Sequence, residues 1–227
     1  MKNENIHIYE KPSVTVDIVI YTIQENTLKV LLVKRGIEPF KNKWAIPGGF
    51  VRVHESLEDA AKRELEEETG VKDVYLEQLY SFGDPKRDPR GRVITVTYLA
   101  LINSDLIKLK AATDVCEVKW FSINHLPILA FDHKNILEYS LKRLKWKFEY
   151  TSVAFSLLPF SFSLGQLQKL YEIVFNKKLD KRNFAKKILS LNILNKEGIK
   201  KDVSHRPPRL YSLKKDIPSV IEILHPN

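Results

Sequence analysis

The sequence predicts an α/β protein (α+β) in two parts, a larger domain of strands and helices followed by a small domain of two helices and a β-hairpin. Three observations predict this organisation. Segments with alternating apolar residues, typical of strands, recur through the first half of the chain. A glycine turn and a carboxylate-rich helix interrupt them. The last third changes to helical periodicity and carries most of the excess positive charge.

The elements of the first part follow from the period of the apolar residues. Val14 to Tyr21 places Val, Val, Ile and Ile at every second position, which indicates a strand. Ser56 to Thr69 has apolar residues four apart, which indicates a helix that starts at the cap residue Ser56 and ends at Gly70. The other expected strands are Thr27–Val33, Val74–Phe82, Val93–Ile102 and Val115–Phe121, and a second helix is expected over His133–Lys147.

The second part begins near residues 148–160, an aromatic-rich segment that contains Pro159 and reads as a packed connection. Leu164–Phe175 follows as a helix with Ser163 at its N-cap, and Asp180 caps a further helix over Lys181–Leu191. A hairpin is expected around Lys196–Asp202, returning through Arg209–Leu213. This layout predicts a winged helix-turn-helix, and we expect domains at residues 1–150 and 151–227.

The composition is that of a globular protein, since 44% of the 227 residues are hydrophobic and 29% are charged. No apolar run is long enough to span a membrane, and the N-terminal residues lack the apolar centre of a signal peptide. The single cysteine, Cys116, excludes an internal disulfide. We therefore expect a cytoplasmic protein.

The net charge of +9 lies almost wholly in the second part. Residues 1–150 contain 23 Lys/Arg and 22 Asp/Glu, whereas residues 151–227 contain 14 Lys/Arg and 6 Asp/Glu. This asymmetry favours a polyanionic partner for the second part. A solvated lysine-rich surface would give the same counts, so charge alone leaves both interpretations open.

One spaced motif carries the chemistry. The pattern G-x5-E-x7-R-E-U-x-E-E-x-G-U, where U is bulky and aliphatic, is matched at every fixed position from Gly49 to Val71. Glu64, Glu67 and Glu68 stand at helical positions i, i+3 and i+4, so their carboxylates project from one face. Three carboxylates held this close repel one another unless a hard cation such as Mg²⁺ or Mn²⁺ neutralises their charge. The alternative, an acidic surface helix, is the interpretation we accept for Glu66.

This motif resembles the Nudix box, and the resemblance covers roughly residues 10–130. It implies an α/β/α sandwich with a mixed sheet, and hydrolysis of a diphosphate linked to a nucleoside. It implies metal ligation by Glu64, Glu67, Glu68 and the carbonyl of Gly48. Arg63, four residues before Glu67, completes the expected catalytic set. Glu55 is expected to stabilise the junction of loop and helix.

The substrate's phosphates require cations, and its base favours a stacking partner. The candidates for phosphate binding are Arg35, Arg87, Arg90 and Arg92, each of which could equally be a solvated loop arginine. Phe50 and Tyr21 are candidates for stacking, with core packing as the alternative for both.

Further segments resemble those of Nudix-related transcriptional regulators: Ser81–Arg92, Ala130–His133, Leu158–Pro159 and Leu179–Phe184. These regulators fuse a Nudix sensor to a winged helix and act as dimers on palindromic operators. The best-known branch controls NAD metabolism and senses ADP-ribose, and others sense sugars such as arabinose. Many members have a degraded box. The complete box here departs from that pattern and keeps hydrolysis open.

The resemblance and the charge together predict contact with DNA. The expected DNA-binding residues lie on the second helix of the motif and in the wing: Lys181, Arg182, Asn183, Lys186, Lys187, Lys200, Lys201, His205 and Arg206. The favoured function is an ADP-ribose-type sensor that regulates transcription and retains hydrolysis. The alternative is an ADP-ribose pyrophosphatase whose second domain serves dimerisation.

Overall fold

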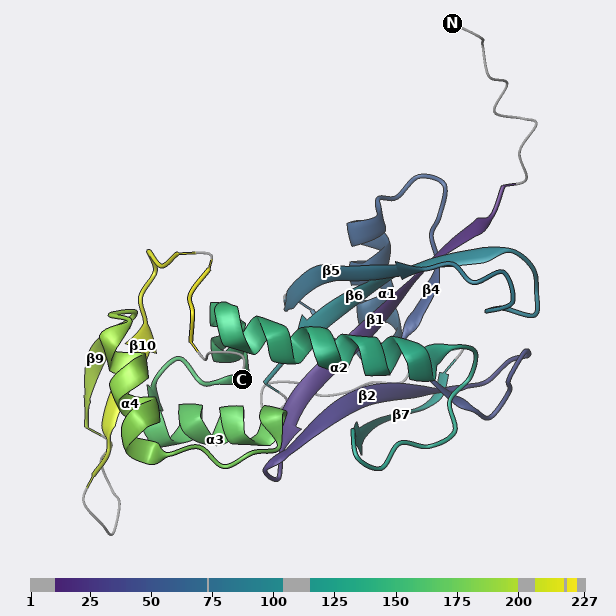
Figure 1. The fold of residues 1–227 in the computed structure, drawn as a ribbon. Helices are drawn as coiled ribbons and strands as arrows, with labels where there is room; N and C mark the ends of the chain where they lie inside the picture. The colour runs from purple at the N-terminus through teal and green to yellow at the C-terminus, as the bar shows by residue number, and fades with distance from the viewer. Residues whose placement is uncertain (1–10, 73, 104–114, 200–206, 219, 224–227) are drawn as a thin grey trace, which may run out of the picture.

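The computed structural model describes residues 11–72, 74–103, 115–199, 207–218 and 220–223 (Figure 1). Two groups of elements follow one another along the chain. The first comprises β1 (Ser13–Gln24), β2 (Thr27–Arg35), β3 (Trp44–Ala45), β4 (Gly48–Phe50), α1 (Leu57–Thr69), β5 (Tyr75–Phe82), β6 (Val93–Leu101), β7 (Val115–Ser122) and α2 (His133–Tyr150). The second comprises η3 (Ser152–Leu157), β8 (Phe162–Ser163), α3 (Leu164–Phe175), α4 (Lys181–Ser190), β9 (Leu194–Ile199) and β10 (Arg209–Leu213).

The first group forms a seven-stranded sheet in the order β3-β2-β1-β6-β5, to which β4 and β7 add by pairing with β1 and β2. β1 and β6 are parallel, whereas β2, β4 and β5 pair antiparallel with their neighbours. The sheet is therefore mixed, as the family resemblance implied.

Helices cover both faces of this sheet. Val16, Ile18 and Ile20 of β1 pack in one cluster with Ala61 and Leu65 of α1. The alternate β1 residues Val19 and Tyr21 join a second cluster with Ile136, Leu137 and Leu144 of α2. Apolar alternation suggested one buried side of β1, but the strand is central and both its sides are buried. The three-layer sandwich is thus confirmed.

The second group forms a winged helix. Ser163 and Gln166 make a reciprocal capping box at α3, and the Asp180 side chain accepts the N–H of Asn183 at the start of α4. The hairpin of β9 and β10 follows, and the two-residue strand β8 pairs with β10. β8 was not predicted, because so short a strand has no period of its own.

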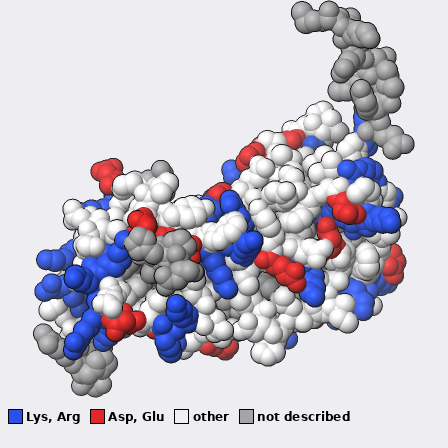
Figure 2. Space-filling model, in the orientation of Figure 1, with Lys and Arg blue, Asp and Glu red and all other residues white. Residues whose placement is uncertain are grey.

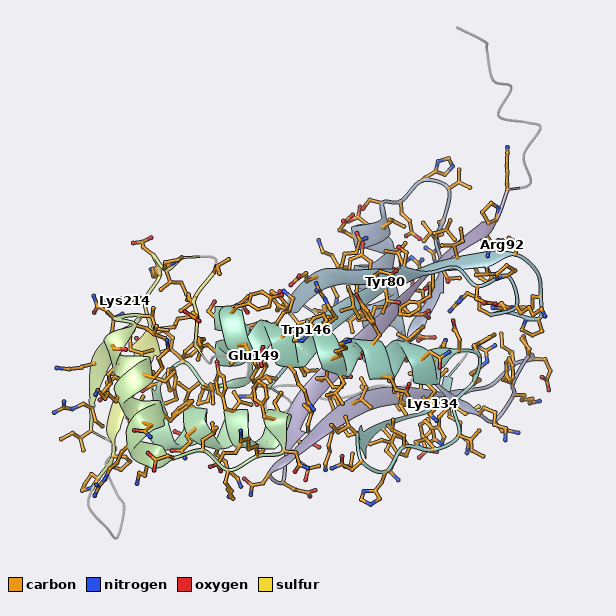
Figure 3. The ribbon with its side chains drawn as sticks, viewed as in Figure 1. Tyr80, Arg92, Lys134, Trp146, Glu149 and Lys214 are labelled. Carbon is orange, nitrogen blue, oxygen red and sulfur yellow. The ribbon has the colours of Figure 1, made fainter. Side chains whose placement is uncertain are left out.

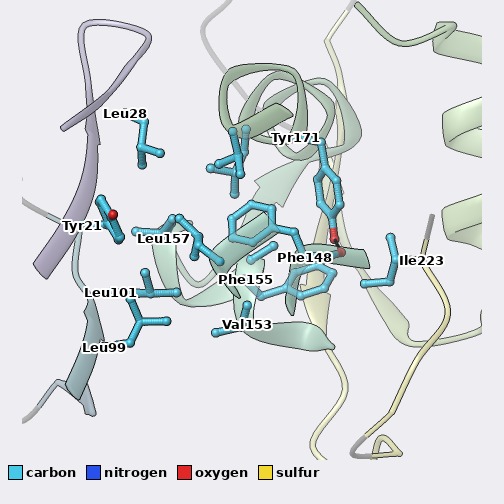
Figure 4. Close-up of a cluster of buried hydrophobic side chains, with 14 of the residues drawn as sticks. Tyr21, Leu28, Leu99, Leu101, Phe148, Val153, Phe155, Leu157, Tyr171 and Ile223 are labelled. Atoms are coloured by element: carbon cyan, nitrogen blue, oxygen red, sulfur yellow. Dashed lines mark hydrogen bonds between the residues drawn. The ribbon is translucent and has the colours of Figure 1, made fainter. Parts of the chain in front are cut away.

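The two groups share one apolar core (Figure 4). Phe148 of α2 packs on Tyr171 of α3 with ring centroids 5.3 Å apart, and the Tyr171 hydroxyl donates to the Phe148 carbonyl at 3.0 Å. The aromatic segment after α2 packs inward through η3, as expected of a packed connection. Among the described residues, no helix has the length and apolarity needed to cross a bilayer.

Candidate functional site

The glycine turn of the motif is fixed against the central strand. Gly48 and Gly49 lie in β4, opposite Asp17 and Val16 of β1. A Cβ atom on Gly48 would stand 2.1 Å from the carbonyl oxygen of Val16, a separation that real Cβ atoms do not show. Glycine is therefore required here so that the two backbones can approach.

Helix α1 begins and ends where the motif predicts. Ser56 is the N-cap and accepts the N–H of Asp59, while Gly70 closes the helix in the left-handed conformation with φ 75°. These ends orient the helix so that Glu64 and Glu68 face the glycine turn. The Glu68 carboxylate accepts the N–H of Gly48 at 2.9 Å, and a Cβ on Gly49 would lie 2.3 Å from Oε1 of Glu64.

Arg63 is the hub of the polar contacts around the helix. Its Nε and Nη2 bind the two oxygens of Glu55 at 2.9 and 2.6 Å, and Nη1 contacts Glu64 at 2.5 Å and Glu67 at 3.1 Å. Nη2 also donates to the carbonyl of Phe50 at 3.1 Å. Hydrogen bonds from Arg63 hold the pKa of Glu55 at about 2. Arg63 and Glu55 thus tie the loop after β4 to α1.

Glu64 and Glu68 are held in surroundings that disfavour their charge. Burial raises the pKa of Glu64, with neighbouring Glu67 acting in the same direction. Burial also raises the pKa of Glu68 to about 8, and the negative charges of Glu64 and Asp17 add to that rise. A cation placed among these carboxylates would remove both the repulsion and the need for protonation.

Glu67 differs from the two other carboxylates. Its side chain is half exposed and bound by Arg63 and by Arg52, whose Nη2 lies 3.5 Å from Oε1. Over the ranges the structure describes, no three acidic, His or Cys side chains already converge as a metal cage. Arg63 Nη1 contacts both Glu64 and Glu67, and the assignment of all three glutamates to a metal site stays a prediction. The oxygen-rich donor set nevertheless fits a hard divalent ion.

A cleft of about 450 Å³ opens above these carboxylates. Of the expected ligand-binding residues, it is lined by Arg35, Phe50, Arg87 and Arg90. Arg35 donates through Nε to the Pro39 carbonyl at 2.8 Å, but its Nη2 is buried and meets no acceptor among the described residues. A buried guanidinium nitrogen without a partner is costly, and an anion in the cleft would satisfy it.

An aromatic wall faces the arginines. Arg90 lies over the rings of Phe50 and Phe131, 5.0 and 5.5 Å from their centroids, and Arg35 lies 4.9 Å from the Phe131 centroid. Phe131 has a left-handed backbone with φ 51°, and its ring packs edge-on against Phe40. From the sequence, Phe131 stood out only as part of the segment Ala130–His133, which resembles the regulator family. Its position just before a helix in that segment is the signal that could have identified it.

The expected ligand-binding residues do not all share this role. Arg87 is buried and directed at acidic side chains, Asp132 at 2.9 Å and Asp17 at 3.4 Å. Arg92 is exposed, lies outside the cleft lining and donates to the Gly83 carbonyl at 2.6 Å (Figure 3). Tyr21 is buried in the core, with its hydroxyl 2.7 Å from that of Ser140. Arg92 and Tyr21 lie outside the cleft lining, so neither is among the proposed ligand contacts.

Two residues that sequence reasoning missed complete the floor of the cleft. His133 is buried, and its Nδ1 accepts the N–H of Ile46 at 2.9 Å. Burial lowers the pKa of His133, so the ring is neutral at pH 7. Asp17 lies 3.8 Å from Nε2 of the same ring. Both were hidden because their partners are remote in the sequence.

The expected DNA contacts gather at the other end of the molecule. Lys181, Arg182 and Asn183 are exposed in the first turn of α4, Lys186 is exposed one turn later, and Lys187 is half-buried. Figure 2 shows Lys and Arg side chains clustered over the winged-helix end. Lys200, Lys201, His205 and Arg206 lie outside the described residues.

Both parts of the chain match families of known proteins. Residues 11–144 match the NUDIX domain, and residues 154–213 match the NrtR DNA-binding winged helix domain. The "ADPR responsive transcriptional repressor NtrR" of Acinetobacter baylyi is 37% identical over 207 residues, which cover 89% of this chain and 82% of that protein.

Two further relatives resemble different aspects of the chain. The "ADP-ribose pyrophosphatase" of Methanocaldococcus jannaschii is 41% identical over 142 residues, covering 62% of this chain and 78% of that protein. The crystal structure of Shewanella oneidensis NrtR complexed with a 27mer DNA superposes with a TM-score of 0.78 at 36% identity, covering 88% of this chain and 93% of that one.

Proposed function

Because this chain belongs to the family of regulators that join a NUDIX domain to an NrtR DNA-binding winged helix domain, we propose that it controls transcription in response to ADP-ribose. Residues 1–150 form the sensor in this proposal, and residues 151–227 bind operator DNA. The protein acts as a homodimer on a palindromic operator in the cytoplasm. This is the function that the described cleft supports best.

One observation carries the ligand assignment. The cleft places the unpartnered Nη2 of Arg35 and the aromatic wall of Phe50 and Phe131 beside the recessed carboxylates Glu64 and Glu68. ADP-ribose combines a pyrophosphate, which an arginine binds, with an adenine ring, which an aromatic surface stacks. The A. baylyi relative is named for its response to the same compound.

We also propose that the cleft retains pyrophosphohydrolase activity, yielding AMP and ribose 5-phosphate. Glu64, Glu67, Glu68 and the Gly48 carbonyl would hold Mg²⁺ or Mn²⁺, which supplies charge neutralisation and a more acidic water when bound. Arg63 positions Glu64 and Glu67, and Arg35 and Arg90 would bind the phosphates. We assign to Glu68, whose carboxylate lies against the glycine turn, the acceptance of a proton from the attacking water.

A second candidate function is an ADP-ribose pyrophosphatase whose winged helix serves dimerisation alone. The complete motif and the relative from M. jannaschii favour it. The exposed cations at the start of α4 favour the regulator, since that end of a recognition helix enters the major groove.

The test is a mobility-shift titration of the full chain against DNA from its own upstream region, with and without ADP-ribose. We expect tight binding that ADP-ribose changes and that weakens steeply with salt. The double variant Lys181→Ala/Arg182→Ala should lose affinity and lower the salt slope by about 0.9 per lost phosphate contact. Lys134→Ala, an exposed change in the first turn of α2, away from the winged helix, is the control.

Two outcomes would decide against the proposals. DNA binding that salt does not weaken, or that ADP-ribose leaves unchanged, would contradict the proposed regulatory function. If the protein hydrolyses no member of a panel of nucleoside diphosphate sugars with Mg²⁺, the proposed pyrophosphohydrolase activity is wrong. The Lys181→Ala/Arg182→Ala variant should hydrolyse ADP-ribose at the wild-type rate, because α4 contributes nothing to the cleft lining.

A further inference from the structure

Helix α2 runs from the sheet of the first group to the winged helix (Figure 1). Its 18 residues span about 27 Å at 1.5 Å per residue. Its first residue, His133, lines the cleft, and Phe148 in its last turn is buried against α3. A single rigid element therefore touches both the ligand site and the DNA-binding domain.

The cleft end of α2 is held by a buried ion pair. Nε and Nη2 of Arg87 donate to the two carboxylate oxygens of Asp132 at 3.1 and 2.9 Å. Nη2 also reaches Asp17, which stands opposite Gly48 in the sheet. Arg87 lines the cleft, so an anion bound there would meet the guanidinium that also holds Asp132.

Asp132 holds the start of α2 through its backbone and Arg87 through its side chain. It is the N-cap residue, and its carbonyl accepts the N–H of Asn135 at 2.9 Å. Its side chain makes no capping hydrogen bond, and its carboxylate is bound by Arg87. The ion pair therefore fixes the residue at which α2 begins.

The C-terminal end of α2 is linked to α4 through Tyr171 of α3. The Tyr171 hydroxyl donates to the Phe148 carbonyl at 3.0 Å (Figure 4). The Tyr171 ring packs on Phe184 of α4 with centroids 5.4 Å apart. Tyr171 and Phe184 are both buried. Tyr171 therefore contacts both α2 and the helix that carries Lys181 and Arg182.

We propose that the Arg87–Asp132 pair, helix α2 and Tyr171 couple the cleft to the recognition helix, with Arg87 and Asp132 as positioning residues for the regulatory response. The inference rests on the proposed function, because it requires a ligand in the cleft that alters DNA affinity. A run of contacts is a route only if changing one link changes the coupling between the two sites.

The experiment measures that coupling directly. Its readout is the ratio of DNA dissociation constants with and without saturating ADP-ribose, by fluorescence anisotropy on the full chain. Asp132→Asn keeps the shape but removes the charge that holds Arg87, and Tyr171→Phe removes only the hydroxyl at the far end. The control, Glu138→Gln, breaks an exposed ion pair with Lys134 on the same helix.

We expect the wild-type ratio to lie in the range of roughly 5- to 150-fold. Asp132→Asn and Tyr171→Phe should each reduce the effect of ADP-ribose on the DNA dissociation constant by about 2- to 30-fold. Glu138→Gln should leave the ratio of dissociation constants unchanged. Calorimetry on Tyr171→Phe should show ADP-ribose binding without DNA at wild-type affinity, because the residue lies far from the cleft.

Each other result overturns a stated claim. A wild-type protein whose DNA affinity ignores ADP-ribose removes the proposed function. If Asp132→Asn and Tyr171→Phe show the same ratio of DNA dissociation constants as a responsive wild type, the proposed coupling route is wrong and the proposed function stands. An equal loss in Glu138→Gln also overturns the route, because it would show a general softening of α2. Should Asp132→Asn fail to fold, Tyr171→Phe decides.

Discussion

The Glu68 carboxylate accepts the backbone N–H of Gly48 at 2.9 Å, which fastens the last turn of α1 to the glycine turn before it. Glu68 thereby remains recessed beside Glu64 and Asp17, whose charges contribute to its raised pKa. The hydrogen bond does not require a charge on Glu68. An amide at this position would preserve the contact and remove only the acid–base and metal-binding capacity.

Glu68→Gln should therefore fold normally and lose ADP-ribose hydrolysis by roughly 10²- to 10⁴-fold, the usual contribution of a general acid or base. Release of AMP in the presence of Mg²⁺ measures the loss. The matched control is Glu66→Gln on the same helix, because Glu66 pairs with Lys72 on the exposed side. Equal activity in the two variants would contradict the role proposed for Glu68.

The adjacent glycines should respond differently to the same substitution. An alanine Cβ at Gly48 meets backbone, the Val16 carbonyl at 2.1 Å, whereas at Gly49 it meets the movable carboxylate of Glu64 at 2.3 Å. Gly48→Ala should reduce the free energy of unfolding by about 1–3 kcal/mol, as overpacking does. Gly49→Ala should mainly weaken Mn²⁺ binding, because it displaces Glu64.

Urea denaturation and manganese titration by electron paramagnetic resonance separate these two effects. Gly83→Ala is the control, since a Cβ there makes ordinary contacts from 3.6 Å outward. Loss of stability in Gly49→Ala as great as in Gly48→Ala would show that Glu64 cannot move aside.

The arginines of the cleft give a third prediction. Arg35→Lys retains the charge but loses the buried Nη2 that lacks an acceptor among the described residues. We expect ADP-ribose affinity, measured by calorimetry, to fall by roughly tenfold or more, since a hydrogen bond to a charged group contributes about 1.5–3 kcal/mol. Arg92→Lys, outside the cleft, should bind like the wild type. The assignment of Arg35 to the ligand fails if the two variants bind alike.

Local spacing was enough to predict the elements that carry the motif. Ser56, Gly70, Ser163 and Asp180 mark helix ends by their own chemistry, and the structure places each at the cap predicted. Interactions of this kind lie within one turn of helix, so the sequence displays them directly.

The rest of the site depends on contacts between distant residues. Arg87 reaches Asp17 across 70 positions, and the His133 ring reaches Ile46 across 87. Only the parallel pairing of β1 with β6 and the return of α2 bring these residues together. Spacing likewise placed Arg92 with the other loop arginines, although its guanidinium binds the Gly83 carbonyl. A single sequence carries no period that distinguishes such cases.

His133 gives the last prediction, on the pH dependence of stability. Burial lowers its pKa, as do the charges of Arg87 and Arg35, while Asp17 and Asp132 act in the opposite direction. His133 is therefore protonated near pH 6.5 in the unfolded chain but stays neutral there in the folded protein. The free energy of unfolding consequently falls as the pH drops below about 6.5. This contribution can change by at most about 1.4 kcal/mol per pH unit.

His133→Asn should flatten that dependence, because an asparagine oxygen can accept the Ile46 N–H without titrating. The free energy of unfolding of both proteins is measured by urea denaturation with a metal chelator at pH 7.5 and 5.5. The other titratable groups are the same in both proteins, so their contributions cancel in the comparison. Among them is Glu68, whose raised pKa favours the folded state as pH falls and so acts in the opposite direction. Parallel pH profiles for the two proteins would mean that His133 accepts its proton in the fold, and that the neutral ring assigned to the cleft floor is wrong.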